Sequence, residues 1–111
     1  MAEKRNISRK RKRIRLRFGP EEPKKMAFTD DISFDGLFIK TATPEIPGVL
    51  LHIEIILPDE TQVLCKGRIH WAKRVPANML RLAGKAGMGV KLLSFTQGEQ
   101  GFIEFVESLQ R

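Results

Sequence analysis

The sequence is poor in the residues on which disulfide frameworks and membrane spans depend. Cys65 is the single cysteine among 111 residues, which excludes an intramolecular disulfide framework and fits a reducing compartment. No apolar run reaches the roughly 18 residues that a membrane-spanning helix needs. No apolar segment follows the basic start, as it would in a secretory signal. We therefore expect about one domain, located in the cytoplasm, without a membrane span.

Catalytic and metal-binding constellations are also missing. Both histidines fall inside predicted strands, with a spacing unlike that of metal ligands. Cys65 lies on an alternating apolar face, which is typical of a buried structural thiol. Asp30, Asp31 and Asp35 form a group that could bind a hard cation, but they lack the spacing of a calcium loop. The sequence predicts neither an enzyme nor a protein that holds a metal or a cofactor.

Positive charge is concentrated at one end of the chain. The net charge is +7, and residues 1–17 hold nine basic residues against one acidic residue. The other 94 residues hold 11 basic and 12 acidic side chains, so the rest of the chain is nearly neutral. A protein that grips a nucleic-acid duplex usually spreads its cations over a folded face. Composition alone also allows a solvated basic tail.

Alternating polar and apolar residues predict six strands. In the first of them Ile14, Leu16 and Phe18 would share the inner face. A short polar turn joins the two longest strands and indicates a hairpin, in which Trp71 is placed on the inner face as a core residue. Glycines in the last strand suggest a bend or a close approach of the backbone. The predicted strands are residues 14–18, 26–29, 36–41, 49–57, 62–72 and 87–93.

The end of the chain changes to a helical period. Thr96 and Glu99 fit a capping box at a helix start, and Phe102, Val106 and Leu109 recur on one face. We expect a helix at about residues 97–110. The predicted fold is dominated by β-structure: a small six-stranded antiparallel β-barrel, which removes exposed strand edges, with a C-terminal α-helix.

Two short motifs carry a resemblance to a known family. Arg9 and Arg13 form an Arg-x-x-x-Arg pattern directly before the first predicted strand. Asp31, Ser33 and Gly36 form Asp-x-Ser-x-x-Gly before the third. Together they resemble the PilZ domain, a family of bacterial receptors for cyclic di-GMP. The resemblance covers roughly residues 9–107 and implies a six-stranded barrel with a terminal helix. We therefore expect a flexible basic arm at residues 1–8 and a PilZ-like domain at 9–111.

The two motifs differ in specificity. Arg-x-x-x-Arg also occurs at Arg5/Arg9, Arg11/Arg15 and Arg13/Arg17. The pair Arg9/Arg13 is preferred because Arg13 immediately precedes the first strand, where the family places its second arginine. The Asp-x-Ser-x-x-Gly pattern matches at every defined position.

The resemblance implies a ligand-binding role for all five motif residues. Arginine forks pair with a phosphate or with the O6 and N7 atoms of guanine, so Arg9 and Arg13 would close over the ligand. Asp31 would accept from the guanine N1–H and amino group, and Ser33 would donate to a phosphate or base. Gly36 would allow a close approach. A local turn is the alternative reading of Asp31 and Ser33, and a bulge or positive φ that of Gly36.

We expect a stand-alone adaptor whose arm closes on cyclic di-GMP and alters a surface that a protein partner binds. Two alternatives remain open. The first is a nucleic-acid-binding barrel that uses the basic arm on phosphates, and the second is a PilZ-like module that works through protein contacts without the nucleotide. The nearly neutral barrel counts against the first, and the complete set Asp31, Ser33 and Gly36 counts against the second.

Overall fold

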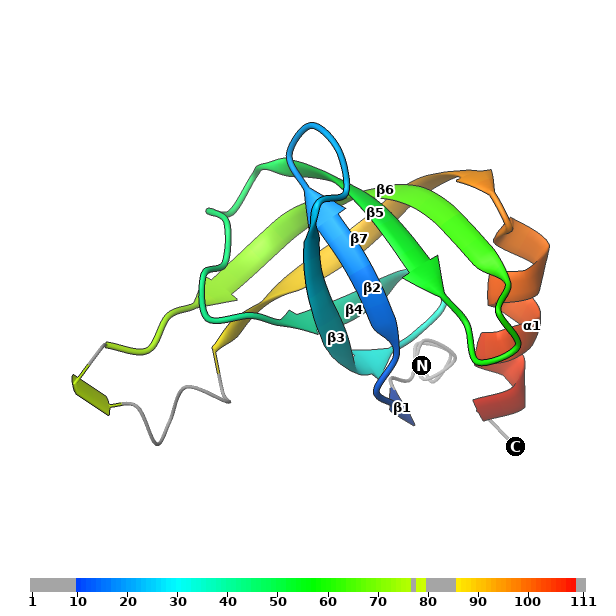
Figure 1. Cartoon of the computed structure of the whole chain (residues 1–111), viewed down its shortest axis with the longest axis horizontal. Coiled ribbons are helices and arrows are strands. Elements are labelled where there is room, and N and C mark those ends of the chain that lie inside the picture. Colours follow the sequence, from blue (N-terminus) through cyan, green and yellow to red (C-terminus); the bar gives the residue numbers. More distant parts are fainter. Residues whose placement is uncertain (1–9, 77, 80–85, 110–111) are drawn as a thin grey trace, which may run out of the picture.

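The structure is a computed structural model that describes residues 10–76, 78–79 and 86–109. It contains seven strands and one helix, shown in Figure 1. The predicted arm at residues 1–8 lies outside the described residues. The elements are β1 Lys10–Arg11, β2 Arg15–Gly19, β3 Lys25–Ile32, β4 Gly36–Lys40, β5 Leu50–Ile56, β6 Gln62–Lys73, β7 Gly87–Gln97 and α1 Glu99–Leu109.

Six of the strands close into an antiparallel barrel. The order along the sheet is β3-β2-β5-β6-β7-β4, and a pairing between β3 and β4 closes the ring. The two-residue strand β1 adds to β3 beyond the start of β2. The predicted six-stranded barrel with a C-terminal helix is thus confirmed, with β1 as an extra strand. Two strands are longer than predicted, because β3 continues through Ile32 and β7 through Gln97.

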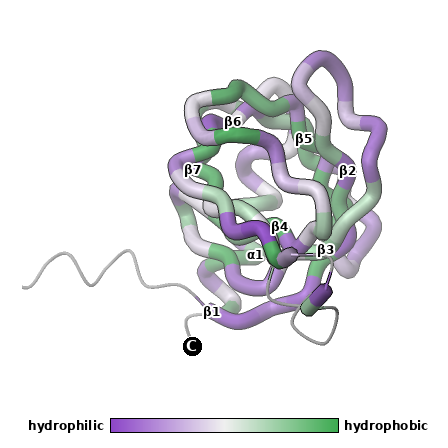
Figure 2. Tube along the Cα trace, turned by 90° about the vertical axis from the view of Figure 1, so that its left-hand side faces the viewer, coloured by the Kyte–Doolittle hydropathy of each residue, from purple (hydrophilic) through white to green (hydrophobic). Residues whose placement is uncertain are grey.

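Alternating side chains fill the barrel. Ile14, Leu16 and Phe18 are all buried, as their spacing predicted. Figure 2 shows hydrophobic and hydrophilic residues alternating along the strands around the barrel. Each inward side chain that is fully buried contributes about 1.5–3 kcal/mol through the apolar surface that it removes from water. The other large side chains with less than 2% exposure include Ile32, Leu37, Ile39, Leu51, Ile53, Ile55, Ile69 and Met88.

The helix α1 lies at one end of the barrel, beside the turn that joins β5 to β6 (Figure 1). Phe102 and Val106 are buried in the core, and the rings of Phe95 and Phe102 lie 5.3 Å apart. None of the helices in the part of the chain that the structure describes is long and apolar enough to cross a membrane.

The predicted capping box at the start of α1 is wrong. Thr96 is still part of β7, and its hydroxyl donates to the carbonyl of Leu64 in β6 at 3.3 Å. The helix instead begins after Gly98, whose φ of 79° reverses the chain direction. The Phe102 amide donates to the Gly98 carbonyl at 3.0 Å as the first helical bond. Strand pairing with β6 outcompetes the local cap, because Phe95 and Gln97, on either side of Thr96, still pair with Cys65 and Leu64.

Candidate functional site

A cavity of about 560 Å³ lies on the outer wall of the barrel, over β1, β3, β4 and β6. It is the place where the acidic motif, the base of the basic arm and an aromatic pair meet. Cationic, acidic and aromatic side chains therefore share one surface. The lining residues are Arg11, Asp30, Asp31, Phe38, Lys40, Trp71 and Lys73.

A β-bulge in β3 turns Asp31 toward this cavity. Thr29 pairs with Ile39 and Asp31 pairs with Phe38, so Asp30 is an extra residue with no counterpart on β4. A bulge of this kind changes which residues face inward. Thr29 is 1% exposed and Ile32 is fully buried, while the two aspartates between them are both partly exposed. Without the extra residue, strict alternation after Thr29 would direct Asp31 into the core.

A second bulge, in β6, does the same for Trp71. Ile69 pairs with Val90 and Trp71 pairs with Gly89, so His70 is the extra residue on this strand. Trp71 is 50% exposed as a result, whereas Ile69 is 1% exposed. The prediction that Trp71 belongs to the core was therefore wrong. Alternation placed it inward, and the bulge shifted the following residues by one position to the outer face.

The two glycines of β7, Gly87 and Gly89, leave room for the rings of Phe38 and Trp71. The rings of Phe38 and Trp71 stack with centroids 5.2 Å apart and an interplanar angle of 27°. A Cβ atom at Gly89 would lie 2.3 Å from Nε1 of Trp71, and one at Gly87 would lie 2.5 Å from Cζ of Phe38. These glycines were expected to allow a close approach, and the groups that come close are the aromatic rings, which reach over β7 from β4 and β6.

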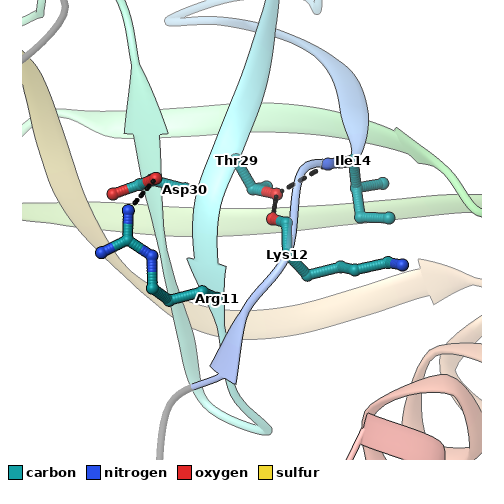
Figure 3. Close-up of polar contacts among 5 residues, drawn as sticks. All are labelled: Arg11, Lys12, Ile14, Thr29 and Asp30. Atoms are coloured by element: carbon teal, nitrogen blue, oxygen red, sulfur yellow. Dashed lines mark hydrogen bonds and ion pairs between the residues drawn. The ribbon is translucent and has the colours of Figure 1, made fainter.

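The buried hydroxyl of Thr29 fixes the base of the arm. Arg11 pairs with Asp31 and Arg15 pairs with Phe28. Three residues lie between the two arginines but only two between their partners on β3, so the pairing is interrupted there. Thr29 fills the interruption, because its hydroxyl accepts from the Ile14 amide at 2.9 Å and donates to the Lys12 carbonyl at 2.5 Å. Figure 3 shows this clasp and the side chains of Arg11 and Lys12 extending in opposite directions.

Arg11 and Arg13, which follow the arm, lie in neighbouring positions on the outer wall. Arg11 pairs with Asp31 across β1 and β3, and its guanidinium lies 3.3 Å from the Asp30 carboxylate. The guanidinium carbon of Arg13 lies 4.0 Å from the ring centroid of Phe28. Arg13 lines an adjoining hollow of about 220 Å³ that shares Asp30 with the main cavity. Arg9 lies outside the described residues.

Ser33 and Gly36 form the turn between β3 and β4. The Ser33 amide donates to the Gly36 carbonyl at 2.8 Å. The Ser33 hydroxyl is fully buried, 3.1 Å from the same carbonyl and 3.2 Å from the Asp35 carboxylate. Gly36 begins β4 opposite Lys91 of β7. These bonds hold the turn that the alternative reading of Ser33 described, and the ligand-binding role of both residues stays a prediction.

The cavity brings together positive charge, a hydrogen-bond acceptor and an aromatic face. Arg11, Lys40 and Lys73 are its cations, Asp31 supplies a carboxylate acceptor, and the half-exposed Trp71 offers its ring. Sequence reasoning missed Arg11, Phe38, Lys40, Trp71 and Lys73 as site residues. Only the glycines of β7 had indicated a close approach at this place. Within the described ranges, no three His, Cys, Asp or Glu side chains lie close enough to hold a metal ion.

Comparison with known proteins identifies the family and the fold. Residues 3–108 match the model of the PilZ domain family. The fold is similar to that of the Bacillus subtilis inhibitor of motility (MotI/DgrA), with a TM-score of 0.74 and 18% sequence identity over 94% of this chain. The match covers 50% of that protein, so the chain spans about half its length. No protein with curated annotation is similar enough to match.

Proposed function

This chain belongs to the PilZ domain family, a family of non-catalytic receptors for cyclic di-GMP, and from that premise we propose that it binds cyclic di-GMP on the outer wall of its barrel. The observation that supports this proposal best is the position of Asp31. A bulge turns its carboxylate outward into a cavity that also contains Arg11 and the stacked rings of Phe38 and Trp71.

Each group in the cavity suits a part of the ligand. The carboxylate of Asp31 would accept from the N1–H and amino group of one guanine. The exposed face of Trp71 would stack on a purine, an interaction worth about 1–3 kcal/mol per base. Lys40 and Lys73 would attract the phosphodiester groups as point charges, and Arg11 would pair with them bidentately.

The arginines of the arm would close the site from the other side. In the proposed complex Arg9 and Arg13 contact the ligand, and Arg13 leaves or shares its cation–π contact with Phe28. The motif pointed to Arg9 and Arg13, but the arginine that pairs with Asp31 across β1 and β3 is Arg11. Arg11 would exchange its exposed ion pair with Asp30, which is worth little in water, for a ligand phosphate. In the same complex Ser33 and Gly36 would present the turn to the ligand.

Ligand binding would then act as a switch. Ordering the arm on the ligand costs conformational entropy and changes the surface that the barrel offers to a protein partner. The structural relative is named as an inhibitor of motility, and we propose a comparable regulatory role for this chain as a cytoplasmic adaptor. In hydrogen-exchange measurements, the amides of residues 5–13 should gain protection on ligand addition. Unchanged exchange at saturating ligand would contradict the closing arm.

A calorimetric titration of the full chain with cyclic di-GMP tests binding itself. We expect micromolar affinity or better for the wild type. Asp31→Asn keeps the shape of the side chain but removes its charge, and we expect at least a tenfold loss, since a hydrogen bond to a charged group contributes about 1.5–3 kcal/mol. Asp59→Asn, in the exposed turn between β5 and β6, serves as the control and should bind as the wild type does.

Two other outcomes would direct the function elsewhere. If the wild type does not bind cyclic di-GMP, receptor function for this chain is wrong. The chain can instead be tested with DNA. If it binds DNA, keeps that binding in Asp31→Asn and loses it with rising salt, the basic arm binds nucleic-acid phosphates through its charge.

A further inference from the structure

A second, smaller cavity adjoins the site on the far side of Trp71. Its volume is about 200 Å³. Trp71 belongs to the linings of both cavities, so the two are separated by a single side chain. No motif of the sequence pointed to this place, because its residues come from the turn before β4, from the bulge of β6 and from β7. They are Asp35, His70, Trp71, Gly89, Val90 and Lys91.

Lys91 is the lysine that lines this second cavity, which has no arginine among the described residues of its lining. It is exposed on the outer face of β7, where its neighbours in the sheet are Gly36 on one side and Arg68 on the other. Gly36 has no side chain, so β4 places no side chain directly opposite the lysine. Arg68 is directed elsewhere, since its guanidinium donates to the Gly48 carbonyl at 3.0 Å.

The acidic group of the cavity forms no ion pair with Lys91. The Asp35 carboxylate accepts from the Ser33 hydroxyl at 3.2 Å, within the turn before β4. Among the described residues, no carboxylate oxygen lies within 4.0 Å of the Lys91 ammonium group. Lys91 is therefore a cation without a counter-ion among the described residues, and an anion bound in this cavity would supply one.

We propose that this cavity is a second anion subsite, in which Lys91 binds a phosphodiester group of the ligand while Trp71 separates it from the first cavity. The inference rests on the proposed function, since cyclic di-GMP carries two phosphodiester groups. One is held on the side of the arm by the arginines and by Lys40 and Lys73, and the other lies against Lys91. His70, the extra residue of the β6 bulge, is exposed and lines the same subsite.

The experiment compares charge-removing variants of two lysines by calorimetric titration with cyclic di-GMP at two salt concentrations. Lys91→Gln should weaken binding about tenfold, as expected for the loss of one charge-assisted hydrogen bond, and should make the affinity less sensitive to salt. Lys91→Arg should keep most of the affinity. Lys66→Gln is the matched control: Lys66 is an outer-face lysine of β6 that pairs with Ser94 and lines neither cavity, and its loss should leave the affinity unchanged.

The outcomes separate the two proposals. If the wild type binds, Asp31→Asn loses affinity and Lys91→Gln binds with wild-type affinity and salt dependence, the subsite is refuted while receptor function stands. An equal loss in Lys91→Gln and Lys66→Gln would also refute it, since any surface lysine would then have the same effect. Absence of wild-type binding overturns both proposals. Because Lys91 is exposed, its variants should melt at the wild-type temperature, which shows that a loss of binding is not a loss of folding.

Discussion

Replacing Thr29 with valine tests whether one buried hydroxyl holds the base of the arm to the barrel. Valine has nearly the shape of threonine, so the change leaves no cavity and preserves the preference for a strand. It removes the acceptor for the Ile14 amide and the donor to the Lys12 carbonyl, at 2.9 Å and 2.5 Å. The variant therefore removes both side-chain hydrogen bonds at the interruption between β1 and β2 and keeps the backbone bonds from Lys12 to Asp30 and from Thr29 to Ile14.

The expected loss of stability follows from the burial of the two partners. Ile14 is 3% exposed, so its amide would remain without a hydrogen-bond partner inside the protein, at a cost of about 1–3 kcal/mol. The bond to the Lys12 carbonyl is only partly buried, so its loss should cost less than that of the Ile14 bond. We expect a decrease of about 2 kcal/mol in the free energy of unfolding, which for a domain of this size lowers the melting temperature by roughly 10 °C.

Urea unfolding and thermal melting measure this decrease. Thr96→Val is a matched control, because the hydroxyl of Thr96 is exposed and makes one bond of 3.3 Å to Leu64; its cost should stay within about 0.5 kcal/mol. Thr29→Ser keeps a hydroxyl and should recover part of the stability. If Thr29→Val unfolds within about 0.5 kcal/mol of the wild type, the hydroxyl does not hold the arm and the reasoning fails.

Two further predictions concern the aromatic pair and the buried thiol. Gly89→Ala places a Cβ atom 2.3 Å from Nε1 of Trp71, so the ring should move, which will shift the tryptophan fluorescence and weaken cyclic di-GMP binding; an unchanged spectrum with unchanged affinity would show that the ring has room. Burial raises the pKa of Cys65 from 9.0 to about 12, so over that pH range the unfolded thiol loses its proton while the folded one keeps it. Stability should therefore fall as pH rises from about 9 toward 12, and urea unfolding of Cys65→Ala should show a weaker decline; equal declines would mean that the thiol titrates alike in both states.

Much of the barrel could be predicted from local pattern. Ile14, Leu16 and Phe18 alternate with arginines, and a period of two admits few structures other than a strand with one buried face. The hairpin of β5 and β6 was equally readable, because a short polar turn separates two long alternating runs. The capping box failed at Thr96, where the pattern is short and pairing with a distant strand decides the outcome.

The site was only partly predictable. Asp31 belongs to a motif with fixed spacing, so the sequence could point to it. Trp71 was assigned to the wrong face, because alternation cannot show where a strand carries an extra residue. Arg11 looked like one of many arginines in the arm, and the pairing of β1 with β3 is what places it opposite Asp31.

The sequence by itself determined the class of fold and most of the buried faces of the strands, since both depend on local periodicity. The tertiary structure decided which side chains share the candidate site. Bulges at Asp30 and His70 turn Asp31 and Trp71 outward, and glycines in β7 let two rings cross it. These features arise from pairing between strands that are distant in sequence, so no local pattern encodes them.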